Sequence, residues 1–404
     1  MSTLLCRRAA AGFLLCLAAL ALAPRARAET AVERLAKLKQ VVQAQADHQA
    51  YPITGIDPAD VRTVLATLKS ASSDAWAAAW TAMGDKRAAR AANDVDPAVA
   101  RKNWQQAWLD DMFGAWPAQT TPGKRAAYEK SIAAFRQYGK LLEFPVETVR
   151  IPFAGGQIVG YLQVPRSGRP VPAVLNIGGL DEYKEYTVAH TTGAMLKAGL
   201  ATFSIDMPGT GESPVKMAPD SERMIIAALN YLRTRPEIDP NRIAVNGASA
   251  GGYWSALTAY DARNLIKAAV VRGGPIHYYF EAYWQRKSWG TNEYLFGLKE
   301  ARLFVYGFKP DQERQFLADL PRFSLLNQGI LDKPSAPMLV VNGAKDAQVP
   351  IADLYLLLRT GSPKYAWVNP DGGHTGRSIG WSDQQINDKV VVPWLVTMLS
   401  PGAS

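Results

Sequence analysis

The spacing of hydrophobic residues divides the chain into two parts. Between residues 29 and 144, apolar residues recur at helical spacing, alanine is frequent and β-branched runs are few, which favours helices. The helical segments predicted here are Ala31–Ala44, Val61–Leu68, Trp76–Met83, Ala98–Trp108 and Ala126–Leu142. We therefore predict an N-terminal helical domain over residues 29–144.

From Val146 onward, short apolar runs alternate with helical patterns. Val146–Phe153 and Gln157–Val164 flank a glycine-rich turn and predict a hairpin. Further strands are predicted at Ala173–Ile177, Ala201–Ile205, Ile243–Asn246, Ala268–Arg272, Met338–Asn342 and Tyr365–Val368. Helices are expected to begin near Tyr186, Ser221, Ala250, Ile351 and Asp383. This alternation predicts a mostly parallel, doubly wound sheet with helices on both faces, within a domain of residues 145–404.

One long interval interrupts that alternation. Residues 275–332 are helix-leaning and rich in aromatic residues, so we expect an insertion that folds over the site as a cap. Some of its aromatic side chains should pack against the helical domain, where tryptophans also recur. Others could line an apolar or aromatic substrate pocket, and the two roles are compatible.

The first 28 residues have the pattern of a secretory signal peptide. Arg7 and Arg8 precede an apolar run of about 15 residues, which is short for a membrane span. Ala26-Arg27-Ala28 then offers a small-x-small cleavage site. We therefore expect a periplasmic or secreted protein without stable membrane insertion after cleavage. The choice between general and twin-arginine export stays open.

Composition narrows the function further. Removing residues 1–28 leaves 41 Lys and Arg against 36 acids, a net charge of +5 with no long basic block, so nucleic acid is not an expected partner. Both cysteines, Cys6 and Cys16, lie in the signal segment. The mature chain therefore has no disulfide, thiol nucleophile or cysteine-based metal site, and we expect neither a metal nor a cofactor. Homodimer formation stays open.

Ser249 is the candidate nucleophile. It lies in Gly247-Ala248-Ser249-Ala250-Gly251, between a predicted strand and a predicted helix. Glycines at both ends allow a tight strand-to-helix turn that exposes the serine hydroxyl. The Ala250 N–H at the helix start is a candidate oxyanion donor. We expect a second donor from Gly179 or Leu180, in the small-residue loop after the strand at 173–177.

A serine hydroxyl needs a base in contact and an acid behind that base. His374 follows the last predicted strand after two glycines and is the preferred base, while His277 at the start of the cap competes for that role. Asp346 follows the strand at 338–342 and is the candidate acid. The chain order Ser249, Asp346, His374 is that of α/β-hydrolases.

These motifs resemble the α/β-hydrolase branch that contains the fermentation–respiration switch esterase and 2,6-dihydroxypseudooxynicotine hydrolase. The resemblance spans about residues 120–400 and rests on five segments. These are Gly178–Asp181 with Lys184-Glu185, Asp206–Gly211, Gly247–Gly251, Asn342–Asp346 and Gly372–His374. It implies the α/β-hydrolase fold, with Ser249, Asp346 and His374 as nucleophile, acid and base.

The resemblance also bears on the substrate. The pseudooxynicotine enzyme cleaves a carbon–carbon bond with an additional glutamate, and Glu281 lies in a comparable neighbourhood here. We take Glu281 with His277, Tyr278 and Trp284 as candidate substrate contacts. The leading hypothesis is an esterase-like serine hydrolase acting on a small molecule of apolar or aromatic character. The alternatives are a C–C hydrolase of a β-diketone-like substrate on the same triad and a non-catalytic binding or regulatory homologue.

Overall fold

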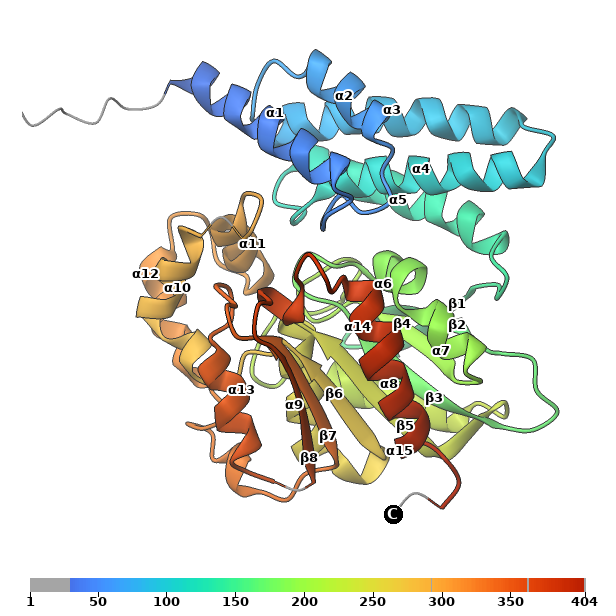
Figure 1. Ribbon diagram of the computed structural model, residues 1–404, viewed down its shortest axis with the longest axis vertical. Helices are drawn as coiled ribbons and strands as arrows, with labels where there is room; N and C mark the ends of the chain where they lie inside the picture. The colour runs from blue at the N-terminus through green and yellow to red at the C-terminus, as the bar shows by residue number, and fades with distance from the viewer. Residues whose placement is uncertain (1–29, 292, 362, 403–404) are drawn as a thin grey trace, which may run out of the picture.

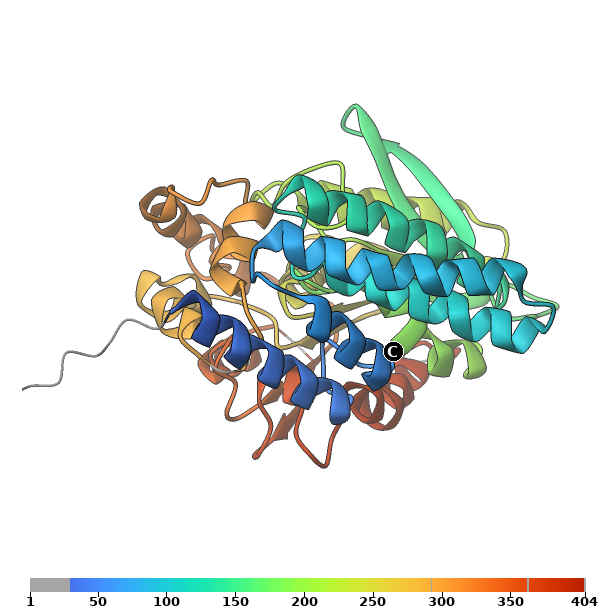
Figure 2. The ribbon, with the colours of Figure 1, turned by 90° about the horizontal axis from the view of Figure 1, so that it is seen from above.

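A computed structural model describes residues 30–291, 293–361 and 363–402 of the chain. The expected signal peptide falls outside these ranges. Five helices come first: α1 (Ala31–Asp47), α2 (Pro58–Thr67), α3 (Ser73–Asn93), α4 (Pro97–Ala115) and α5 (Pro122–Lys140). They form a layer across one end of the α/β unit (Figures 1 and 2). Among the described residues, no helix is both long and apolar enough to cross a bilayer.

Local sequence explains where these five helices begin. Each is preceded by a Thr, Asp or Ser whose side chain accepts a backbone N–H from the first turn. Three of them carry proline at the start, where the missing N–H leaves no bond unmade. Between the helices lies a core of aromatic rings, among them Trp80, Trp108 and Phe113, which are fully buried. The same core includes Tyr161 and Tyr183 of the α/β unit, so the layer is packed onto that unit.

The sheet has eight strands in the order β1-β2-β4-β3-β5-β6-β7-β8. Their bounds are β1 (Glu147–Phe153), β2 (Gly156–Gln163), β3 (Val171–Ile177), β4 (Ala201–Ile205), β5 (Ile238–Ala248), β6 (Ala268–Arg272), β7 (Met338–Gly343) and β8 (Lys364–Asn369). β2 pairs antiparallel with β1 and β4, and every other pair is parallel. The predicted hairpin and mostly parallel sheet are thus confirmed.

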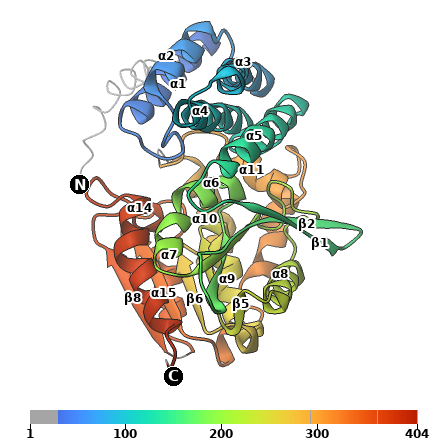
Figure 3. The ribbon, with the colours of Figure 1, turned by 90° about the vertical axis from the view of Figure 1, so that its right-hand side faces the viewer.

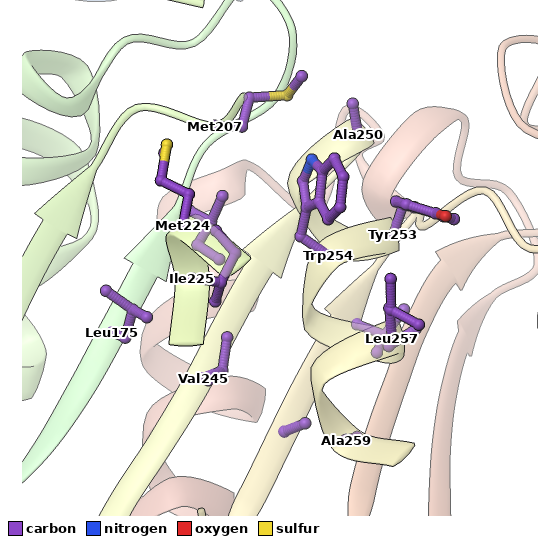
Figure 4. Packing of buried hydrophobic residues seen from close by; sticks show 14 of the residues in the cluster. Leu175, Met207, Met224, Ile225, Val245, Ala250, Tyr253, Trp254, Leu257 and Ala259 are labelled. Carbon is purple, nitrogen blue, oxygen red and sulfur yellow. The ribbon is translucent and has the colours of Figure 1, made fainter. Parts of the chain in front are cut away.

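Helices cover both faces of the sheet (Figure 3). One face packs against α8 (Glu222–Thr234), α9 (Ala250–Asp261) and α13 (Ile351–Leu358). The other packs against α7 (Thr192–Lys197), α14 (Asp383–Ile386) and α15 (Val392–Met398). Helix α9 is buried on all sides from Ala250 to Tyr260. Figure 4 shows Trp254 of α9 pointing toward Ile225 and Met224 of α8, and these residues belong to the same buried cluster as Val245 of β5.

The chain between β6 and β7 forms the cap. It contains α10 (Ala282–Trp289), α11 (Leu298–Val305) and α12 (Glu313–Asp319), which lie beside the α/β unit below one end of the helical layer (Figure 1). Inside it, the buried Arg302 guanidinium donates to Gln285 Oε1 and Ser288 Oγ, both at 2.7 Å. These bonds hold α11 against α10. A short helix α6 (Lys184–His190) completes the fold after β3.

Helix α4 carries a buried acid that should make stability depend on pH. Asp111 is 3% exposed, and its Oδ1 has no hydrogen-bond partner among the described residues. A Cβ on Gly84 of α3 would lie 2.3 Å from that oxygen, so only glycine leaves room for the carboxyl group. Burial, with a smaller contribution from Asp85, raises the pKa of Asp111 to about 8.

We expect Asp111→Asn to remove part of this pH dependence. A carboxyl group whose pKa is raised in the folded state stabilises the protein below its unfolded pKa of about 4, and that stability is lost as pH rises towards 8. Urea unfolding of both proteins between pH 4 and 9 measures the effect. As pH rises, the free energy of unfolding of wild type should fall relative to that of the variant, by up to a few kcal/mol. Parallel stability curves would contradict this account.

Candidate active site

Ser249 occupies the tight turn between β5 and α9. Its backbone has φ 53° and ψ −124°, a strained conformation for a residue with a side chain. The turn depends on the flanking glycines. A Cβ on Gly247 would lie 2.1 Å from the Gly251 carbonyl oxygen, and one on Gly251 would lie 2.2 Å from that of Ile177. The sequence motif thus produces the turn for steric reasons, and the serine hydroxyl projects at the carboxyl edge of the sheet.

The structure brings the three predicted triad residues into one hydrogen-bonded row. His374 Nε2 lies 2.8 Å from Ser249 Oγ, and His374 Nδ1 lies 2.8 Å from Asp346 Oδ2. Because the Asp346 carboxylate accepts from Nδ1–H, Nε2 carries the lone pair and faces the serine hydroxyl. This is the arrangement that a general base requires.

Asp346 is itself held in place by its own loop. Its Oδ1 accepts the backbone N–H groups of Gln348 and Val349 at 2.8 and 2.9 Å. The Asn342 side-chain amide donates to Oδ2 at 2.9 Å. These three donors stabilise a negative charge at this position and fix the direction of the carboxylate toward His374.

The cap supplies a carboxylate that sequence reasoning missed. Glu293 accepts the backbone N–H of His374 through Oε1 and that of Ala347 through Oε2, the latter at 2.7 Å. It therefore joins the loop of the candidate base to the loop of the candidate acid. Nothing in the local sequence around Glu293 marks this role, because both partners are more than 50 residues away along the chain.

We expect Glu293→Gln to lower kcat by about 10- to 100-fold with little change in KM, since small displacements of a catalytic group have effects of this size. An amide can accept only one of the two N–H groups, and its NH2 would face the other. Glu281→Gln, in an exposed cap glutamate, is the matched control and should behave as wild type. Equal kinetics for both variants would exclude a positioning role.

The predicted oxyanion donors lie around the nucleophile. A Cβ on Gly179 would be 3.1 Å from Ser249 Cβ, so the backbone of this loop passes directly beside the serine. Gly179 and Leu180 both line the cavity at the triad. Ala250 is the first residue of α9, whose N-terminal N–H groups carry a partial positive charge. The three residues thus lie beside the candidate nucleophile.

The cavity at Ser249 is small and polar. Its volume is about 40 Å³, and it lies where all three parts of the molecule meet. Tyr51, Pro52 and Trp116 come from the helical domain, and Glu293, Tyr294 and Leu295 come from the cap. The α/β unit contributes several charged groups, namely Asp181, Glu182, Arg377 and Asp383.

Burial and ion pairing shift the pKa values of these groups in different directions. Burial raises the pKa of Glu182 to about 7 and also raises that of Asp181. Burial opposes ionisation of Asp383 as well, but Arg377 and Arg272 outweigh it and lower its pKa to about 2. The Asp383 carboxylate accepts from both guanidinium groups, at 2.6 Å from Arg272 and 3.0 Å from Arg377. One side of the cavity is thus a fixed ion-pair network.

The four candidate substrate contacts are not among the residues that line this cavity. His277 does not contact Ser249, since its Nδ1 is 2.7 Å from Ser324 Oγ. Trp284 donates its indole N–H to the Gln348 carbonyl, and Tyr278 and Glu281 are exposed. The first turn of the cap contacts α13. The later segment around residues 293–295 returns to the site.

No group of three or more His, Cys, Asp and Glu is arranged to hold a metal ion within residues 30–291, 293–361 and 363–402.

The fold and the site together define the class of protein. An α/β-hydrolase is defined by this strand order, by the strained serine turn and by the hydrogen-bonded row of serine, histidine and aspartate. The class predicted from the sequence is confirmed.

Comparison with known proteins places the chain more narrowly. A family model described as esterase FrsA-like matches residues 54–363, and the chain belongs to this family of hydrolases. It is 31% identical over 251 residues to the α/β-hydrolase ucsC of Acremonium sp, an alignment that covers 54% of this chain and 50% of that protein. It is 25% identical over 240 residues to the esterase FrsA of Vibrio vulnificus, covering 55% of this chain and 58% of the relative. In both cases the chain spans about half the length of the relative.

A solved structure extends the fold likeness over nearly the whole chain. The 2,6-dihydroxy-pseudo-oxynicotine hydrolase superposes with a TM-score of 0.71 at 20% identity and covers 90% of this chain and 95% of its own. The fold is therefore shared well beyond the α/β unit, and the helical layer belongs to it. The branch that the sequence motifs resemble is thereby confirmed.

Proposed function

We propose that the chain is a serine hydrolase that cleaves a carboxylic ester or a related acyl bond through an acyl-enzyme on Ser249. The observation that carries this proposal is the continuous row from Asp346 through His374 to Ser249, with both contacts at 2.8 Å. Such a row lets a serine hydroxyl lose its proton as it attacks a carbonyl carbon. Family membership supports the hydrolase class.

The proposed reaction has two halves. Ser249 Oγ attacks the substrate carbonyl while His374 Nε2 takes the proton, and the resulting oxyanion is directed toward Gly179, Leu180 and the Ala250 N–H. The C–O bond then breaks, and His374 returns the proton to the leaving alcohol. In the second half, water loses a proton to His374 and attacks the acyl-enzyme, which releases the acid and restores Ser249.

Covalent labelling tests the nucleophile directly. A short-chain fluorophosphonate should modify the wild-type protein at Ser249, as read by mass spectrometry of the labelled peptide, and should leave Ser249→Ala unmodified. Absence of labelling in folded wild-type protein would favour the alternative function, that of a non-catalytic binding or regulatory homologue.

Asp181 favours a second candidate, hydrolysis of a C–C bond in a β-diketone-like aromatic substrate. This buried acid lines the triad cavity and its Oδ2 accepts the Trp116 indole N–H at 3.1 Å. Its raised pKa suits a group that donates a proton, and cleavage of a C–C bond leaves a carbanion or enolate that needs one. Poor turnover of p-nitrophenyl esters, together with cleavage of a β-diketone to a carboxylic acid and a ketone, would select this reaction.

Export is proposed on the N-terminal sequence alone. Expression of the full chain in a Gram-negative host should place processed protein, beginning near Glu29, in the periplasm or medium. Protein lacking residues 2–28 should stay in the cytoplasm. Unprocessed full-length chain in the cytoplasm would contradict the proposal.

A further inference from the structure

A second and much larger cavity lies between the helical domain and the cap. Its volume is about 570 Å³, within the range of about 300–1,000 Å³ typical of small-molecule sites. Apolar side chains from both parts line it, including Leu38 of α1, Trp76 of α3, and Phe296, Phe304 and Phe308 of the cap. Arg34 and Glu300 are exposed and also lie on its lining, so the cavity opens to solvent between α1 and α11.

Aromatic rings packed two deep separate this cavity from the cavity at the candidate triad. Trp116 and Tyr294 line the cavity at Ser249, whereas Phe296 and Trp76 line the large one. The Trp116 ring is 5.0 Å from Tyr294 and 4.9 Å from Phe296 between centroids, and Phe296 is 5.0 Å from Trp76. We call Trp116, Tyr294 and Phe296 the aromatic wall.

The two volumes show why the wall matters. A cavity of about 40 Å³ holds roughly three water molecules and leaves no room for an acyl or aryl group. The large cavity has that room and faces the wall from the other side. The cavity at Ser249 therefore cannot by itself enclose an acyl or aryl group, and the aromatic wall lies between the nucleophile and the larger apolar space.

Trp116 is held in place on the helical-domain side of the wall. Trp116 is 1% exposed, donates its indole N–H to Asp181 and has its carbonyl bound by the Lys124 ammonium at 2.7 Å. Tyr294 and Phe296, which come from the cap, are only partly buried. Gly297 has φ 74°, a conformation that favours glycine. The two cavities would join if the Tyr294 and Phe296 side chains moved aside.

We propose that the large cavity binds the uncharged apolar acyl or aryl group of the substrate, while the scissile carbonyl passes the aromatic wall to reach Ser249. The inference rests on the proposed serine hydrolase function. It adds a substrate class, esters with a medium or long alkyl chain or an aromatic body, and an entry route between α1 and α11.

The test narrows the cavity at its rim. Ala71 is exposed and lines the large cavity, so Ala71→Trp should place an indole ring in its mouth without disturbing the core. Ala78→Trp is the matched control because Ala78 is exposed on α3 and does not line the cavity. Ser73→Phe, at another lining position, repeats the test if Ala71→Trp accumulates poorly.

Two readouts separate this inference from the proposed function. Binding of the uncharged dye N-phenyl-1-naphthylamine to Ser249→Ala protein should weaken about tenfold when Ala71→Trp is added and stay unchanged with Ala78→Trp. With Ser249 intact, Ala71→Trp should lower kcat/KM for p-nitrophenyl octanoate about tenfold and leave that for p-nitrophenyl acetate within about twofold.

Each failure has a distinct meaning. If short-chain fluorophosphonate does not label Ser249, the proposed function fails whatever the dye does. If labelling succeeds, but dye binding is unaffected by Ala71→Trp or both esters slow equally, the cavity assignment is wrong and the apolar group binds elsewhere.

Discussion

Replacing Ser249 with alanine is expected to abolish turnover, with kcat falling by roughly 10⁶-fold, because no other hydroxyl lies within reach of His374 Nε2 among the described residues. His374→Ala should lose a similar factor, since the alcohol then has no base. Asp346→Ala should lose less, about 10⁴-fold, because the imidazole keeps its place and loses only the partner that fixes its tautomer. Steady-state kinetics on the best p-nitrophenyl ester, with thermal unfolding of each variant, gives the measurement.

The control for this series is Ser255→Ala on the same helix. Ser255 is fully buried and donates to the Val270 carbonyl at 2.8 Å, so its loss should reduce stability by about 1 kcal/mol and leave kcat nearly unchanged. If Ser249→Ala retained more than about 1% of wild-type kcat while folded, the proposed acyl-enzyme mechanism would be wrong.

The candidate triad could be predicted because each of its members follows a strand. Ser249 follows β5, Asp346 follows β7 and His374 follows β8, and parallel strands end at the same edge of the sheet. The apolar runs locate the strand ends, so side chains more than 100 residues apart can be placed together without coordinates. The same reasoning brings the Gly179 loop after β3 to this edge.

Residues that reach the site from outside the sheet could not be predicted in this way. Tyr51 and Trp116 lie in or beside helices whose pattern reports only which face is buried, not what that face covers. Glu293 lies in an irregular segment of the cap with no periodicity to place it. The aromatic content of the cap correctly suggested contact with the helical domain, but it also drew attention to Tyr278 and Trp284, which lie away from the cavity. Tertiary packing determines these positions.

The second large effect is expected when the buried Lys184 is replaced, and it concerns the stability of the folded protein. Its side chain is fully buried, and its ammonium lies 2.9 Å from Asp206 Oδ2, 2.9 Å from Glu185 Oε1 and 2.8 Å from Glu212 Oε2. The Tyr128 hydroxyl of α5 accepts from it at 3.2 Å, so the cluster joins the helical domain to α6 and to the loop after β4. One cation here neutralises part of the charge of three carboxylates.

Lys184→Met should therefore destabilise the protein by about 3–5 kcal/mol at pH 7, because it leaves carboxylates buried without their counter-ion. The loss should grow between pH 4 and 7. Burial raises the pKa of Glu185, and the Lys184 ammonium opposes that rise. Without the ammonium the pKa of Glu185 rises further, so stability falls as pH rises through that window. Urea unfolding at several pH values measures it.

Lys130→Met is the matched control for this prediction. Lys130 pairs with Asp85 at 2.7 Å, but both side chains are about half exposed, so removing the pair should change stability by less than about 1 kcal/mol at any pH. Similar, pH-independent losses for both lysine variants would show that Lys184 acts through packing of its alkyl chain. A loss confined to Lys184→Met that shrinks at pH 4 would show that the buried charge balance holds the helical layer on the α/β unit, and with it the Tyr51 and Trp116 side of the candidate site.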